Sequence, residues 1–202
     1  MCSLPAVAGE WEYRWSTDFK HKFDNRLTAK LEIEYRYASS LEGNFYRHTD
    51  VGLERKCSPS FAMSLNLRKI VEQAKGLAFW EDRPYVNGTF KWNWGNMEFS
   101  DRNRFECRSF STGESNWRYR NSLKITFLPR ERTAVQIVPF VIDEVFYDLS
   151  RGEFNRNRLY LGLESLSQKD LNWEVSYLMQ NSKAPSQWKE VNALVTRLHI
   201  RF

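Results

Sequence analysis

Hydrophobic and polar residues alternate along most of this chain with a period of two. The clearest example lies in residues 26–37, where one set of alternate positions is apolar and the other is charged: Leu27, Ala29, Leu31, Ile33, Tyr35 and Tyr37 against Arg26, Lys30, Glu32, Glu34 and Arg36. Because successive side chains of a β-strand point to opposite faces, the pattern predicts a strand with one apolar and one charged face. Residues 99–127 repeat the pattern around residues 111–115, which predicts a β-hairpin.

The same reading of the whole chain predicts about eleven strands of roughly 10 to 14 residues and no amphipathic helix of useful length. A strand of about eleven residues reaches ~36 Å, and a tilt of ~45° leaves ~25 Å, the height of the apolar band of an outer-membrane barrel. We therefore predict an all-β fold, an antiparallel up-and-down transmembrane β-barrel of about twelve strands. Eleven are counted, and a twelfth requires residues 10–23 to form two short strands.

The connections between the expected strands provide a second test. Those near Asp24, Ser58, Gly95, Pro129 and Ser167 are expected to be short, and those near Ala38, Gln73, Ser111, Ser150 and Asn181 mostly longer. Residues 73–83 form the longest segment expected to be irregular. Alternation of short and long connections is typical of a barrel that crosses the outer membrane, with short turns on the periplasmic side.

Composition agrees with this fold. Of the 202 residues, 15% are aromatic and 27% are charged, and the mean hydropathy is −0.63. A barrel strand needs an apolar residue only at every second position, so a low average hydropathy is compatible with a membrane location. No run approaches the ~20 apolar residues of a membrane-spanning helix. We predict one barrel domain over residues 10–202, preceded by a signal-peptide remnant at residues 1–9, where Ala6, Val7 and Ala8 match the end of a secretory signal.

The net charge of +5 does not predict nucleic-acid binding, because the basic residues are spread among 25 acidic ones and form no run. Three cysteines, Cys2, Cys57 and Cys107, have neither the number nor the spacing of a disulfide framework or a zinc site. A bond between Cys57 and Cys107 stays an open alternative. No metal and no cofactor is predicted.

The charged strand faces carry the candidate site. The residues expected to line the lumen are Arg102, Arg104, Glu106, Arg108, Arg118, Arg120, Lys124, Glu144, Arg158 and Glu164. Cross-strand neighbours of opposite sign are expected to form ladders that neutralise one another and fix the strand register. This structural interpretation is favoured over the functional one, in which the excess of arginine attracts anionic solutes into a narrow pore.

Two alternatives from other classes remain open. A soluble lipocalin-like binder would use the same hairpins with the apolar faces inward. An outer-membrane lipid hydrolase, a lipase or deacylase, would need a nucleophile with a histidine base. The chain has only His21, His48 and His199, and none has an obvious serine partner at its strand level. We therefore predict that the protein is not an enzyme.

The chain ends with a strand in which Leu198, Ile200 and Phe202 alternate with polar residues. A terminal strand with a final Phe resembles the signal by which the bacterial barrel-assembly machinery recognises its clients. We expect this machinery to be a partner during biogenesis.

The chain as a whole resembles an uncharacterised family of bacterial outer-membrane β-barrels, a domain-of-unknown-function family of the porin-like barrel superfamily. The matching residues are Trp11, Glu81, Arg83, Pro84, Tyr85, Arg102, Arg104, Glu106, Trp117, Arg118, Tyr119, Arg120, Glu144, Phe146, Tyr147, Asn157, Arg158, Leu159 and Gly162. The resemblance covers residues 11–202 and implies a fold, but no reaction.

From the residues and the resemblance together we expect a protein of the outer membrane of a Gram-negative bacterium with a charged, Arg-rich lumen. Its expected function is a narrow channel for small or anionic solutes, and the alternative is a structural barrel without transport. Outer-membrane lipid is the expected surrounding partner.

Overall fold

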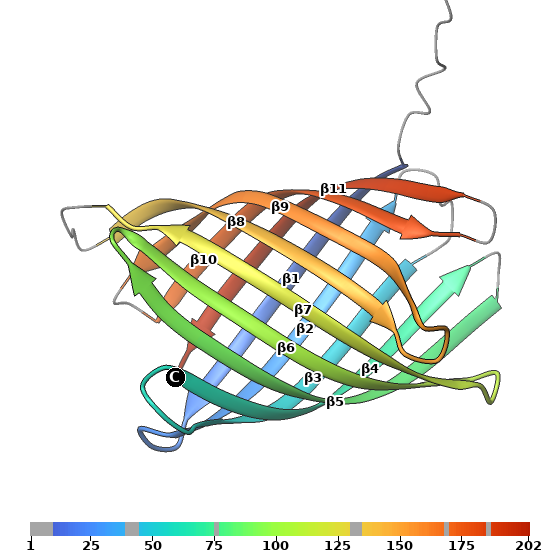
Figure 1. Ribbon diagram of the computed structural model, residues 1–202, viewed down its shortest axis with the longest axis horizontal. Coiled ribbons are helices and arrows are strands. Elements are labelled where there is room, and N and C mark those ends of the chain that lie inside the picture. The colour runs from blue at the N-terminus through green and yellow to red at the C-terminus, as the bar shows by residue number, and fades with distance from the viewer. Residues whose placement is uncertain (1–9, 39–44, 75–76, 130–134, 168–169, 185–186) are drawn as a thin grey trace, which may run out of the picture.

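Eleven long strands close into a single barrel and run obliquely around its axis (Figure 1). The computed structural model describes residues 10–38, 45–74, 77–129, 135–167, 170–184 and 187–202, so the expected signal remnant at residues 1–9 lies outside the described residues. The strands are β1 (Glu10–Lys22), β2 (Leu27–Ala38), β3 (Phe45–Lys56), β4 (Phe61–Ala74), β5 (Leu77–Trp94), β6 (Met97–Phe110), β7 (Ser115–Phe127), β8 (Val135–Asp148), β9 (Glu153–Ser167), β10 (Leu171–Lys183) and β11 (Trp188–Arg201).

The barrel closes through a parallel pair. Strand β1 pairs with β11 in parallel, from Glu10 opposite Val191 to Lys20 opposite Arg201, whereas every other neighbouring pair is antiparallel. Residues 10–22 form one strand, so the described chain contains the eleven strands that were counted and no twelfth. The parallel pair is how an odd number of strands closes. We call the end where β1 begins the N-terminal end and the end where β11 stops the C-terminal end.

The connections do not alternate between short and long, and that prediction was wrong. At the N-terminal end six, two, four, four and four residues separate successive strands, against four, four, two, seven and three at the C-terminal end. Residues 73–83 are mostly strand, because β4 and β5 continue the hairpin as far as Ala74 opposite Leu77. Loop length therefore does not show which end of the barrel would face the periplasm.

The two faces of the barrel wall differ as the alternation predicted. Large apolar side chains are exposed on the outside, for example Leu65 at 66% and Trp117 at 56%. Rings stack between strands there, as for Trp92 and Phe99, whose centroids lie 5.1 Å apart. On the inner face Arg104 is 3% exposed and Glu106 is fully buried. A lipocalin-like binder requires the opposite orientation, so this structure contradicts that alternative.

One part of the inner face is apolar. Buried side chains from β8 to β11 form a cluster, which we call the apolar wall: Phe140, Ile142, Tyr160, Leu178, Ala193 and Val195. Gly162 makes room for it, because a Cβ atom at this position would lie 2.6 Å from Phe140 Cζ and 2.5 Å from the carbonyl oxygen of Val175. Of these residues Phe140, Tyr160 and Val195 lie at positions that the alternation places on a charged, inward face.

The described cysteines do not form a bond. Cys57 and Cys107 are both free thiols. Cys57 follows β3 at the C-terminal end, whereas Cys107 lies opposite Trp117 near the far end of the β6–β7 hairpin. Within the described residues, no helix has both the length and the apolar character needed to cross a membrane.

Candidate functional site in the barrel interior

The interior contains two cavities, one toward each end of the barrel. The C-terminal cavity has a volume of about 810 Å³, and the N-terminal cavity about 460 Å³. Basic residues outnumber acidic ones in both. Sixteen Lys and Arg against ten Asp and Glu line the first, and ten against four line the second. Both cavities therefore present a net positive lining.

Five residues line both cavities, and all five are arginines: Arg14, Arg36, Arg68, Arg120 and Arg158. We call this set the arginine waist. Its members come from β1, β2, β4, β7 and β9, so it surrounds the interior from both sides of the barrel. Any solute passing between the two cavities would have to pass these guanidinium groups.

Two members of the arginine waist meet at an amide. Arg158 Nε donates a 2.7 Å hydrogen bond to Gln180 Oε1, and Arg14 Nη2 donates to the same oxygen at 3.3 Å. Arg14 also pairs with Glu12 at 2.7 Å. A neutral amide satisfies donors without cancelling their charge, so the charge of these two arginines is balanced only by Glu12 and, at 3.4 Å from Arg158, by Glu144.

The members of the waist on β2 and β4 are paired with carboxylates. Arg68 Nε lies 2.7 Å from Asp50 Oδ2, and the Tyr85 hydroxyl donates to the same carboxylate oxygen. Arg36 Nε lies 2.5 Å from Glu34. These charge-assisted bonds hold the side chains in fixed positions inside the barrel.

Glu106 is the centre of the largest network and lines neither cavity. Arg118 donates to Glu106 Oε2 from Nε at 2.8 Å and from Nη2 at 2.5 Å. Arg104 lies 3.4 Å away, and Arg83 and Arg120 lie 4.0 Å away. A fully buried carboxylate surrounded by four guanidinium groups is neutralised on all sides, which is what allows its burial.

Glu144 repeats this arrangement two strands further along, on β8. Arg120 Nη2 lies 2.5 Å from Glu144 Oε1, Arg102 lies 3.3 Å from the same oxygen and Arg158 lies 3.4 Å from Oε2. Some ion pairs join residues that lie directly opposite each other on neighbouring strands, such as Glu144 and Arg158. Arg120 lies opposite Phe146 and contacts Glu144 diagonally. The structure therefore contains cross-strand pairs of opposite sign and additional diagonal ones.

The other expected lumen residues lie outside these two networks. Arg108 binds Glu81 through two hydrogen bonds of 2.7 and 3.0 Å at the N-terminal cavity. Lys124 bridges Glu164 at 2.8 Å and Glu174 at 3.3 Å at the C-terminal cavity. The ten expected residues thus form three groups at different depths.

Three residues of the arginine waist were missed as site residues. Arg14, Arg36 and Arg68 occupy polar positions of alternating strands, so the sequence places them on the inner face. Their common depth depends on the register between strands, which alternation alone does not determine. The available signal was only that each of the three is an arginine at a polar position of its strand.

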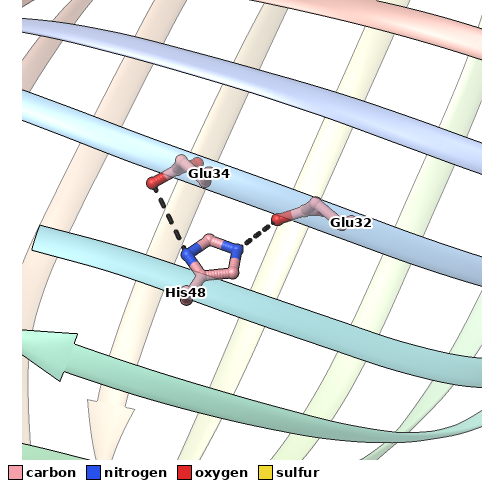
Figure 2. A group of neighbouring side chains, drawn as sticks. All are labelled: Glu32, Glu34 and His48. Atoms are coloured by element: carbon pink, nitrogen blue, oxygen red, sulfur yellow. Dashed lines mark hydrogen bonds and ion pairs between the residues drawn. The ribbon is translucent and has the colours of Figure 1, made fainter.

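One group of residues has the donor atoms of a metal site. Figure 2 shows His48 on β3 facing Glu32 and Glu34 on β2, with Nε2 2.5 Å from Glu32 and Nδ1 3.7 Å from Glu34. Arg68 already lies 3.1 Å from Glu32, and Arg36 binds Glu34. Because two guanidinium groups compete for these carboxylates, we interpret the group as part of the ion-pair system.

The histidines do not form a nucleophile–base pair in the described residues. His48 contacts the Tyr46 hydroxyl at 3.2 Å in addition to the two carboxylates. His199 Nδ1 lies 2.9 Å from Asp18, and the His21 ring packs edge-on against Phe23. None of these contacts supplies a serine or cysteine nucleophile.

Comparison with known proteins identifies a family and a fold. The sequence profile of the family described as "Protein of unknown function (DUF2490)" matches residues 14–191. A search of curated proteins found no match. Among solved structures, the chain is similar to LpxR from Salmonella typhimurium, with a TM-score of 0.58 and 8% identity over 92% of this chain and 87% of that one. LpxR is an outer-membrane barrel, and at this identity the likeness concerns the fold.

Proposed function

This chain belongs to the DUF2490 family, and from that premise we propose that it is a bacterial outer-membrane barrel whose interior is a narrow path for small anionic solutes. The likeness in fold to the outer-membrane barrel LpxR supports the location. So does the outer face, whose exposed aromatic and aliphatic side chains suit contact with acyl chains.

The arginine waist is the observation that carries the proposal. A solute that moves between the two cavities meets five guanidinium groups and is exposed there to a positive field in a partly dehydrated space. Rings of charged side chains give pores their charge selectivity. Ion pairs with Asp50, Glu34 and Glu144 narrow the passage, so the expected conductance is small.

Planar-bilayer recording of the refolded protein tests this proposal. In a salt gradient the reversal potential should show a preference for anions. Arg14→Gln should reduce this preference, because Arg14 belongs to the waist and pairs partly with a neutral amide. Lys69→Gln is the matched control, since Lys69 is 63% exposed and pairs loosely with Asp82 at 3.8 Å. A preference for cations would contradict the proposal.

A structural barrel without transport is the second candidate, and the burial of Glu106 favours it. This carboxylate is fully buried and lines neither cavity, so it fills part of the interior instead of lining a passage. A silent bilayer, obtained with protein that migrates as a folded barrel in unheated gels, would remove the channel and leave this candidate.

A lipid hydrolase is compatible with the fold comparison. It predicts release of fatty acid from outer-membrane lipids by the purified barrel, and loss of that release in His48→Asn or His199→Asn. Absence of turnover would remove this alternative without affecting the channel proposal.

The assembly signal remains part of the proposal. Phe202 is 69% exposed, its backbone N–H donates to the Lys20 carbonyl at 2.9 Å, and its ring stacks on Phe19 at 6.3 Å. We expect Phe202→Ser to lower the yield of assembled barrel in membranes. Lys69→Gln should leave the yield unchanged.

A further inference from the structure

Four arginines surround one buried phenyl ring at the wall of the N-terminal cavity. The guanidinium carbons of Arg118, Arg120, Arg156 and Arg158 lie 5.0, 4.9, 5.6 and 5.0 Å from the ring centroid of Phe146. All five residues line this cavity, and Phe146 is 1% exposed. The ring holds the cationic groups close together through cation–π contacts.

Carboxylates neutralise only part of this group. Glu106 pairs with Arg118, and Glu144 pairs with Arg120 and Arg158. Four positive charges therefore face two negative ones. Arg102 and Arg104 draw on the same two carboxylates, so the surplus around Phe146 is not smaller than two charges.

Arg156 is the member of this group that is available to a ligand. Its Nε donates to Ser182 Oγ at 3.0 Å. Among the described residues, no carboxylate lies within ion-pair distance of Arg156, and its two terminal nitrogens have no hydrogen-bond partner. The side chain is half-buried and lines the cavity.

Arg156 belongs to the last regular pair before a break in the strand register. Strands β8 and β9 pair Phe146 with Arg156 and then Tyr147 with Phe154, which leaves Asn155 as an extra residue. With regular pairing Phe154 would point into the barrel. The bulge turns its ring outward, where it is 61% exposed, and leaves Arg156 at the edge of the cavity. Bulges of this kind commonly aim a side chain at a binding site.

We propose that the arginines around Phe146, with Arg156 as the free member, bind the phosphate of a phosphomonoester in the N-terminal cavity. A phosphomonoester carries about −1.5 to −2 charges at neutral pH and three acceptor oxygens, which matches the surplus. A carboxylate supplies one charge and would leave the surplus uncancelled. The volume of about 460 Å³ lies in the range of small-molecule sites. The proposal deepens the proposed anion path and rests on it for the solute class.

The test measures the binding of small ligands to the refolded barrel in detergent by isothermal titration calorimetry. Glucose 6-phosphate is the probe, glucose and gluconate are the neutral and singly charged comparators, and phosphatidic acid in mixed micelles is a lipid source of the same group. Glucose 6-phosphate should bind at least about tenfold more tightly than gluconate, about 1.4 kcal/mol. Tight binding of phosphatidic acid alone would also support the phosphate site and would assign its source to lipid.

Variants locate the site. Arg156→Gln should weaken phosphate binding by about tenfold or more, whereas Arg151→Gln should change it less than twofold. Arg151 is an exposed residue of the turn between the same two strands and does not line the cavity. Arg156→Lys should weaken binding less than Arg156→Gln, because it keeps the charge and loses the planar donor pair.

The outcomes separate this inference from the proposed function. Equal weakening by Arg156→Gln and Arg151→Gln would overturn the site, as would equal binding of glucose and glucose 6-phosphate. Anion-selective conductance without phosphate binding would leave the channel and remove the site. Phosphate binding lost in Arg156→Gln but with a silent bilayer would keep the site and remove the channel.

Discussion

Two regions of the inner face fill the interior of the barrel with different kinds of side chain. Toward β8–β11 the interior is filled by the apolar wall, with Leu178 and Ala193 fully buried. Across β5–β7 it is filled by arginines and by carboxylates such as Glu106, which is equally buried. Packing requires only complementary shape, whereas each buried carboxylate of the ionic region requires cations around it. Arginines outnumber carboxylates in this region. The ionic region is therefore the one that can interact with a charged solute.

The largest expected loss of stability comes from a substitution in the ionic region, the arginines and carboxylates across β5–β7. Glu106→Gln removes the negative charge shared by Arg118, Arg104 and Arg83, and leaves buried cations without compensation. We expect the free energy of unfolding to fall by about 3–5 kcal/mol, measured by urea titration in lipid vesicles. Asp82→Asn is the control, because its pair with Lys69 is exposed and should contribute less than about 1 kcal/mol. Equal losses of unfolding free energy in the two variants would show that the burial of Glu106 does not increase its contribution to stability.

The matching change in the apolar wall is Leu178→Ala. Truncating this fully buried side chain should cost about 2–5 kcal/mol through lost contacts and a cavity. The difference between the regions should appear with a second substitution. Arg118→Met should recover part of the loss caused by Glu106→Gln, because it removes a buried cation that has lost its partner, and should recover none of the loss caused by Leu178→Ala. If Arg118→Met changed both penalties alike, the contrast between packing and ion pairing would fail.

A smaller effect is expected where the apolar wall is tightest. Gly162→Ala places a methyl group 2.5–2.6 Å from Val175, Phe140 and Ser176, and overpacking of this kind costs about 1–3 kcal/mol. Phe140→Leu in the same chain should recover part of the loss, because it relieves one of the three contacts. A double-mutant cycle measures the coupling between the two substitutions. If their changes in stability were strictly additive, the Phe140 ring would not be what Gly162 makes room for.

The smallest effect lies outside both regions. In the turn between β1 and β2, the backbone N–H groups of Arg26 and Leu27 donate to Asp24 Oδ1 at 2.6 and 2.7 Å and lower the pKa of this carboxyl group. A lowered folded-state pKa stabilises the fold at pH values above the unfolded pKa, and this contribution is lost as the pH falls through the folded one. Asp24→Ala should flatten only this acidic part of the pH–stability curve, while Asp82→Asn should not.

Alternation of residue types was enough to predict the barrel, to count eleven strands and to orient their faces, but not to predict the parallel β1–β11 pair that replaces the expected twelfth strand. It worked because a closed wall with different solvents on its two sides imposes a period of two on every strand. Strand β8 shows the limit, since Val138, Ile142 and Phe146 face inward next to outward apolar residues such as Ile137. Where both faces are apolar, the period disappears.

The candidate site was less predictable than the fold. Residues such as Arg104 and Glu106 were assigned to the inner face by alternation alone. Which of them meet depends on register and on the stagger around the barrel, so the arginine waist and the group around Phe146 could not be deduced. The bulge at Asn155 leaves no mark in the pattern that would distinguish Arg156 from its neighbours.

The parallel pairing of β1 with β11 has a consequence for engineering and for topology. Because these neighbouring strands run in the same direction, the start of β1 and the end of β11 lie at opposite rims of the barrel. A peptide that joined them along the strands would have to span the length of one strand, roughly 40 Å, so circular permutation by a short linker is excluded. In a bilayer, reporter groups fused at Glu10 and Phe202 would face different compartments.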